Sequence, residues 1–129
     1  MRLSVNLLNM EKAGNRKIEY DLEERTFKFA RDCRDLVKKL LKNQHNLEYG
    51  KQLIRSSGSV AANYIEANES LSKKDFVMRI RICKKEAKES GLWLRLIEPK
   101  DEDDEERKRL LNESIELMKI FGAILEKCT

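Results

Sequence analysis

Residues 72–98 carry the strongest periodic pattern of this 129-residue chain, an apolar stripe that keeps helical spacing for three heptads. The stripe consists of Phe76, Ile80, Cys83, Ala87, Ser90, Leu94 and Ile97. Ser72 precedes it as a helix N-cap, and Asp75 follows at the third helical position. Pro99, the only proline, ends the helix because it lacks a backbone donor and disfavours helical geometry in the preceding residue. A long helix with such a stripe must bury it, which most simply happens against other helices.

The remaining sequence repeats this pattern and predicts three further helices, over about residues 22–43, 47–68 and 102–127. Four helices of similar length joined by short turns are typical of an antiparallel up-down-up-down bundle. We therefore expect an all-α four-helix bundle domain over residues 21–129. Residues 1–20 are polar and weakly patterned, and we expect them to form a short N-terminal arm.

The middle of the helix expected over residues 47–68 is unusual, because Ser56-Ser57-Gly58-Ser59 consists of poor helix formers that cost up to about 1 kcal/mol each. Apolar periodicity continues in register on both sides, so we interpret this segment as helix and not as a flexible linker. Its small side chains would let a neighbouring helix approach closely. The expected buried seam of this helix is Leu47, Ile54, Ala61 and Ile65. The helix before it has a wide apolar face, with one stripe at Phe29, Cys33, Leu36 and Leu40 and a second beside it at Phe27, Ala30, Val37 and Leu41.

Composition supports long solvated helices, since 39% of the residues are charged and the chain has only five glycines. No apolar run approaches the ~20 residues that a membrane-spanning helix needs. The three cysteines, Cys33, Cys83 and Cys128, show no metal-site spacing and fall at predicted core positions. We expect free thiols and a cytoplasmic protein that makes no contact with membranes.

Residues for catalysis are not visible in the sequence. His45 is the only histidine, so the Glu-x-x-His pairs of di-iron bundles cannot be formed. The chain also lacks the glycine-rich phosphate loop, the dinucleotide fingerprint and the nucleophile elbow of common enzyme classes. We expect no enzyme activity, no cofactor, no metal and no small-molecule substrate.

Positive charge is concentrated in the first three quarters of the chain. Residues 1–98 hold 21 Lys and Arg against 14 Asp and Glu, whereas residues 99–129 hold 6 against 9. The acids at 101–106 suit the positive end of a helix dipole, although an acidic partner-binding segment is the alternative.

One set of basic residues shares a helix face, because its members are spaced at i, i+3, i+4 and i+7. The set consists of Arg81, Lys84, Lys85 and Lys88. Together with Arg55 we predict these residues to contact the phosphate backbone of structured RNA. An ordinary solvated surface is the alternative for the basic face. For Arg55 the alternative is an ion pair with Glu66 or another acid.

A second apolar stripe lies roughly opposite the first on the helix that Ser72 begins, and it consists of Met78, Ile82, Trp93 and Leu96. A bundle helix needs only one buried face, so a second stripe indicates a subunit interface, with Trp93 as its anchor. In the alternative interpretation, Trp93 covers the N-terminal arm of the same chain.

The segment Arg-Ser-Ser-Gly-Ser-Val-Ala-Ala-Asn over residues 55–63, with Glu66 soon after it, resembles a known family. Lys74-Asp75-Phe76 and the Glu-rich stretch 85–90 extend the resemblance, which covers about residues 20–125. The family is that of four-helix-bundle proteins encoded in intervening sequences of bacterial 23S ribosomal RNA genes. Many members continue with Gly-Phe/Tyr-Gly-Arg where this chain has Ala67-Asn68-Glu69-Ser70, which loses a basic residue and two glycines from the turn.

The resemblance implies a homopentamer arranged as a ring of bundles, with no enzyme activity. A related branch comprises the accessory proteins of diversity-generating retroelements, which bind a reverse transcriptase and its template RNA through a basic surface. Our leading hypothesis is therefore a non-enzymatic, pentameric RNA-binding protein. The second is a protein-interaction scaffold, for example one that docks a reverse transcriptase without touching nucleic acid. An enzyme comes last.

Overall fold

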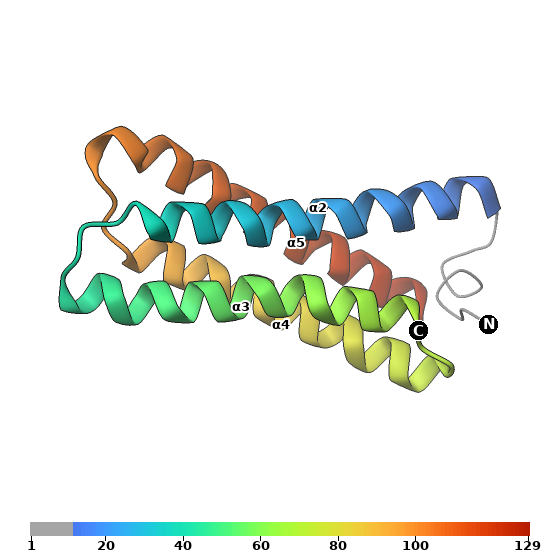
Figure 1. Cartoon of the computed structure of the whole chain (residues 1–129). Helices are drawn as coiled ribbons and strands as arrows, with labels where there is room; N and C mark the ends of the chain where they lie inside the picture. The colour runs from blue at the N-terminus through green and yellow to red at the C-terminus, as the bar shows by residue number, and fades with distance from the viewer. Residues whose placement is uncertain (1–11) are drawn as a thin grey trace.

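The computed structural model describes residues 12–129, with side chains from Leu22 onward, and shows four long helices packed side by side (Figure 1). These are α2 (Lys12–Lys38), α3 (Gln44–Asn68), α4 (Lys73–Leu96) and α5 (Asp104–Lys127), and a short 3-10 helix, η1 (Asp101–Asp103), precedes the last. Successive helices run in opposite directions (Figure 1). The predicted all-α, up-down-up-down four-helix bundle is thus confirmed, and the described residues include no strand.

The starts of α3 and α4 are capped by side chains that accept hydrogen bonds from the first turn. Asn43 Oδ1 accepts from the Asn46 N–H at 2.9 Å, and Ser72 Oγ accepts from the Asp75 N–H at 3.1 Å, as predicted for Ser72. The buried Asn46 amide also donates to the Glu98 carbonyl and accepts from the Glu98 N–H. This side chain therefore joins the turn before α3 to the end of α4.

The bounds of α2 differ from those predicted, since the helix begins at Lys12 and not near residue 22, and ends at Lys38 and not near 43. Residues 12–20 contain good helix formers, so the helix extends through them although they lack a clear apolar stripe. At the other end, backbone hydrogen bonds from Lys39 and Leu40 to residues three positions earlier tighten the chain into the turn. Residues 12–20 of the expected arm are thus helical and continuous with α2, and residues 1–11 lie outside the described residues.

The core of the bundle follows the predicted stripe of α4, all of whose members are buried. Phe29, Cys33, Leu36 and Leu40 of α2 face it, again as predicted. On α5 the fully buried side chains are Leu110, Leu117 and Phe121, and the buried Ser114 and Cys128 lie on the same side. Sequence periodicity thus located the core faces of α2 and α4. On α5 it did so in part, because the predicted seam also included Leu111, Met118 and Leu125, which are only half-buried.

The prediction for α3 was wrong. Leu47, Ile54 and Ile65 of the expected seam are 59%, 44% and 47% exposed. The buried residues of this helix are instead Asn46, Gly50, Leu53, Ser56, Ser57, Val60, Tyr64, Ala67 and Asn68. Close packing explains the difference, because α2 and α4 approach α3 over its small residues, and buried hydroxyls find partners there. The Ser56 and Ser90 hydroxyls, for example, lie 2.7 Å apart across the contact of α3 with α4.

Candidate nucleic-acid interface

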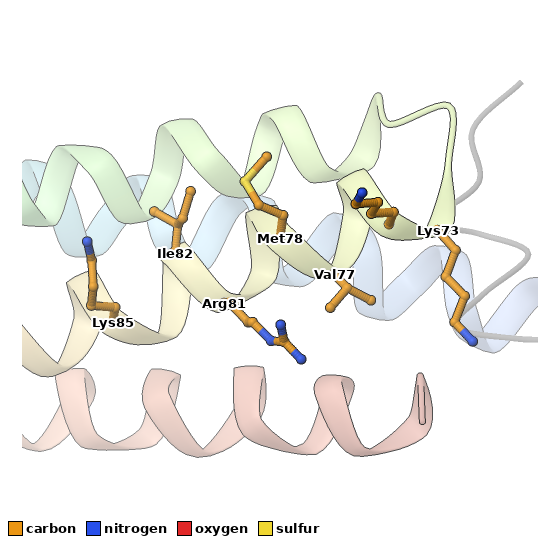
Figure 2. Close-up of a pocket in the computed structure, with 7 residues that line it drawn as sticks. Lys73, Val77, Met78, Arg81, Ile82 and Lys85 are labelled. Carbon is orange, nitrogen blue, oxygen red and sulfur yellow. The ribbon is translucent and has the colours of Figure 1, made fainter.

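The basic face predicted on α4 is solvent-exposed along its length. Arg81, Lys84, Lys85 and Lys88 are all exposed. Figure 2 shows Arg81 pointing toward the α5 side of the helix, whereas Lys85 points away from α5 together with Met78 and Ile82. Lys84 extends over α5 beside Gly122, where a β-carbon would lie 3.7 Å from its Nζ atom. The four cations therefore spread across the outward side of α4 and onto its border with α5.

A shallow hollow of about 650 Å³ lies on this side of α4 (Figure 2). Apolar side chains of Val77, Met78 and Ile82 line it between basic ones, which are Lys73, Lys74, Arg81 and Lys85. Lys73 and Lys74 were missed by the sequence prediction. Lys74 precedes Arg81 by seven residues, so the same helical spacing would have placed it on this face.

The basic residues of this face have no acidic partner among the described residues. No carboxylate there lies within ion-pair distance of the basic side chains around the hollow or of Lys84 and Lys88. Some basic residues elsewhere are compensated: Arg109 pairs with Asp32 and Glu106 at 2.8 Å, and Arg25 makes a two-pronged contact with Glu113. The lysines at the turn from α2 to α3, Lys38 and Lys42, likewise have no partner among the described acids, but they are fewer than those of α4. The uncompensated positive charge of α4 gives this face a field that attracts anions.

Arg55 lies apart from the four α4 cations. Its guanidinium forms ion pairs with Glu86 at 3.2 Å and with Glu89 at 3.5 Å, on the side of α4 that faces α3. The Glu86 carboxylate side chain is only 7% exposed, so Arg55 supplies the positive charge that this burial requires. The alternative of an ion pair is thereby observed, with Glu86 as the principal acid in place of Glu66.

The residues predicted for a subunit interface fall into two groups. Met78 and Leu96 are exposed, and the adjacent Leu92 extends their stripe. Ile82 and Trp93 are half-buried. The Trp93 ring stacks on Tyr49 of α3, with ring centroids 5.8 Å apart and planes 24° apart. Trp93 thus packs within its own chain, against α3, which leaves the other three as the more accessible part of the predicted interface.

The described residues offer no site for metal or thiol chemistry. No group of three His, Cys, Asp or Glu side chains among them could hold a metal ion. Burial raises the pKa of the Cys83 thiol to about 12, and it raises the pKa of Cys33 further. Both thiols are therefore protonated and shielded at neutral pH. In the same part of the chain, no helix combines the length and apolar character that crossing a bilayer requires.

Comparison with known proteins identifies the family. The family model of the 23S rRNA-intervening sequence protein matches residues 19–123. The chain belongs to this family. A solved structure of a protein with unknown function, from the S23 ribosomal protein family of Bacteroides thetaiotaomicron, is similar with a TM-score of 0.72 and 29% identity. The similarity covers 84% of this chain and 97% of that one. Curated proteins show no significant match.

Membership of the 23S rRNA-intervening sequence protein family confirms the resemblance drawn from residues 55–63. The departure from the family pattern at residues 67–70 lies where α3 ends and the turn to α4 begins. Ala67, Asn68 and Ser70 are buried there, and Ser70 Oγ donates to the Glu66 carbonyl at 3.1 Å. The altered turn is thus well packed, and the fold does not depend on the missing glycines. Neither the family nor the structural relative indicates an enzyme.

Proposed function

We propose that this chain is a non-enzymatic, oligomeric bundle protein, a pentamer by family resemblance, that binds structured RNA through the basic face of α4. One observation carries the proposal: Arg81, Lys84, Lys85 and Lys88 are exposed and form no ion pair with the described acids, whereas four of the five basic residues of α5 are paired. Binding of a polyanion would release its counterions and complete the charge balance of this face.

The chemistry of the face favours contacts to the RNA backbone over readout of bases. The side chains around the hollow are cationic or aliphatic. Of the two aromatic rings of α4, Phe76 is buried in the core and Trp93 is stacked on Tyr49. Bases therefore have no aromatic platform on which to stack. Carboxylates of Asp101–Glu106 follow the C-terminal end of α4 and would repel a phosphate chain there. We infer that RNA is bound by its shape, along the first two thirds of α4.

Salt dependence of binding tests the proposal. The probe is a stem-loop RNA, and the variant replaces Arg81, Lys84, Lys85 and Lys88 by alanine. We expect the wild-type affinity to fall steeply between 50 and 200 mM salt, and the variant to lose about one unit of the log-log salt slope per phosphate contact removed. A matched control removes four other exposed lysines, Lys28, Lys51, Lys108 and Lys119, with the same change in net charge. Equal loss in both variants, or binding that salt does not change, would refute a localised RNA face.

The second candidate is a scaffold that docks another protein, for example a reverse transcriptase, through the same face. The apolar residues Val77, Met78 and Ile82 in the hollow favour it, because RNA backbone contacts do not require them. Charge reversal at Lys84, Lys85 and Lys88 separates the two candidates. It should abolish RNA binding, whereas a protein partner held by the apolar residues would still be recovered.

Native mass spectrometry tests the oligomer. A protein purified without nuclease should give five-fold multiples of 15.2 kDa, with additional mass that ribonuclease removes. A pentamer without the additional mass would favour the scaffold, and a monomer would contradict the oligomeric part of the proposal.

A further inference from the structure

A long apolar band lies exposed along the junction of α2 and α3. It combines the two stripes that sequence analysis assigned to the interior, Phe27 and Leu41 from α2 with Leu47, Ile54 and Ile65 from α3. Two hollows occupy its ends, one of about 310 Å³ beside Phe27 and Ile65 and one of about 800 Å³ between Leu41 and Ile54. The band thus follows the helices for most of their length, which matches the footprint of another helix.

Gly58 lies on this band and has no close packing neighbour among the described residues. A β-carbon built at Gly58 meets no atom within 4 Å, whereas one at Gly91 would lie 2.9 Å from Ser114 Oγ and one at Gly50 3.0 Å from Val37. Glycine in a helix interior is unfavourable unless a close approach requires it. At Gly91 and Gly50 that approach is internal. At Gly58 none of the described residues supplies such a neighbour, which leaves space there for the helix of another chain.

The two ends of the band carry opposite charges. Glu23 and Glu24 line the hollow beside Ile65, and Lys38, Lys42 and Lys51 line the one beside Leu47, with Glu48 as the single acid there. A helix that fits this band should therefore be apolar along one side, basic at one end and acidic toward the other.

The outward stripe of α4 has these properties. Met78, Ile82 and Leu96 supply its apolar side chains, and Lys74 and Lys85 lie among them in its first half. Glu89 in its second half is 41% exposed, although its carboxylate also pairs with Arg55 of the same chain at 3.5 Å. Matching the charges places the start of α4 at the Glu23 end of the band. This is also the end at which α4 begins within its own chain (Figure 1), so the two copies would run in the same direction.

Building on the proposed oligomer, we propose that the α2–α3 band of one copy receives the outward stripe of α4 from a second copy. The contact is heterologous, because two different surfaces of the chain meet, and parallel copies joined in this way close into a ring when the rotation allows. Arg81 and Lys84 lie toward the α5 border of α4, and helical spacing places Lys88 with them, so these three remain outside this contact. Lys85 lies within the contact, so in the oligomer the RNA is held by Arg81, Lys84 and Lys88.

Two single variants that each remove one side of the contact test the inference. Ile54→Asp places a charge in the band, and Met78→Asp places one in the α4 stripe; both residues are more than 40% exposed, so each variant should fold with the circular dichroism of the wild type. We expect each variant alone to sediment as a monomer. Mixed in equal amounts, they should form a dimer of twice 15.2 kDa and nothing larger, because only one intact pair of surfaces remains.

Leu71→Asp and Ile115→Asp are the matched controls, since both replace exposed apolar residues that lie outside the two surfaces, and both should keep the wild-type mass. If the wild type is an oligomer and Ile54→Asp or Met78→Asp leaves its mass unchanged, this contact is overturned, although the proposed oligomer stands. Monomeric variants that fail to combine would overturn the heterologous pairing. A monomeric wild type would overturn the oligomer itself, and RNA affinity, measured separately, is not affected by that result.

Discussion

Both faces of α3 carry large apolar residues, but only one of the faces is buried within the chain. The buried face combines Leu53, Val60 and Tyr64 with small residues such as Gly50, Ser56 and Ser57, while the exposed face presents Leu47, Ile54 and Ile65. The small residues let neighbouring helices approach the buried face closely, and the buried hydroxyls find partners there. The exposed apolar residues then point to a contact outside the chain.

The largest effect is expected from a comparison of two adjacent residues on opposite faces of α3, Leu53 and Ile54. Leu53 is fully buried, so Leu53→Ala should lower the free energy of unfolding by about 2–5 kcal/mol through lost burial and the cavity that remains. Ile54→Ala removes a side chain of similar size from an exposed site and should change it by less than about 0.5 kcal/mol in the monomer. Urea titrations at a protein concentration that keeps the chain monomeric measure both values. Equal losses would show that the assigned faces of α3 are wrong.

The same contrast explains how far the sequence could predict this structure. The stripe of α4 and that of α2 through Phe29 and Cys33 were located correctly, because apolar residues there do face the core. On α3 two apolar stripes run side by side, the buried Leu53, Val60 and Tyr64 and the exposed Leu47, Ile54 and Ile65, so helical spacing alone does not decide which of them faces the core. The unusual run Ser56–Ser59 did predict close packing, and the Ser56–Ser90 contact confirms it.

The candidate site was predicted less completely than the fold. Helical spacing placed Arg81, Lys84, Lys85 and Lys88 on one side of α4. It could not show that Arg55 pairs with Glu86, because ion pairs between helices depend on how the helices pack.

A second prediction concerns pH and the polar face of α3, against which two thiols are buried. Cys83 Sγ donates to the Val60 carbonyl, and burial raises the pKa of Cys83 to about 12 from 9.0. Burial raises the pKa of Cys33 as well, and a hydrogen bond with Ser57 lowers it by less than burial raises it. Because the pKa of each thiol is higher in the folded chain than in the unfolded chain, burial of the neutral thiol contributes fully to stability below the unfolded-state pKa of about 9. This contribution is lost as the pH rises from there toward the folded-state pKa.

We therefore expect the free energy of unfolding to fall between pH 8 and pH 10, by on the order of 1 kcal/mol for each of the two thiols. Urea titrations across this range measure the loss. The double variant Cys33→Ala/Cys83→Ala is the control, since it should be less stable at pH 8 but lose less stability on going to pH 10. A loss of the same size in the variant would assign the pH dependence to other groups.

The third prediction separates the two roles of basic residues. Arg55→Ala should lower the free energy of unfolding by about 1–3 kcal/mol, because it leaves the buried Glu86 carboxylate without its cation, although the half-exposed position of Arg55 moderates the loss. Arg81→Ala should leave stability within about 0.5 kcal/mol and weaken RNA binding. Thermal melts and RNA titrations of both variants measure the two effects. If Arg55→Ala weakens RNA binding as strongly as Arg81→Ala at unchanged stability, Arg55 belongs to the RNA contacts.

The smallest effect is expected at Gly58, where one substitution should stabilise the single chain but weaken its association with a second copy. Gly58→Ala adds a methyl group where nothing lies within 4 Å, so it should raise the stability of the monomer by up to about 1 kcal/mol through helix propensity. Gly50→Ala should gain less, because its β-carbon would meet Val37 at 3.0 Å. If a second copy packs against Gly58, the same methyl group should weaken association while it stabilises the single chain. Sedimentation of Gly58→Ala measures the change in association, and urea titration of the same sample measures the change in the free energy of unfolding. Stabilisation without weaker association would show that no helix approaches α3 closely at this glycine.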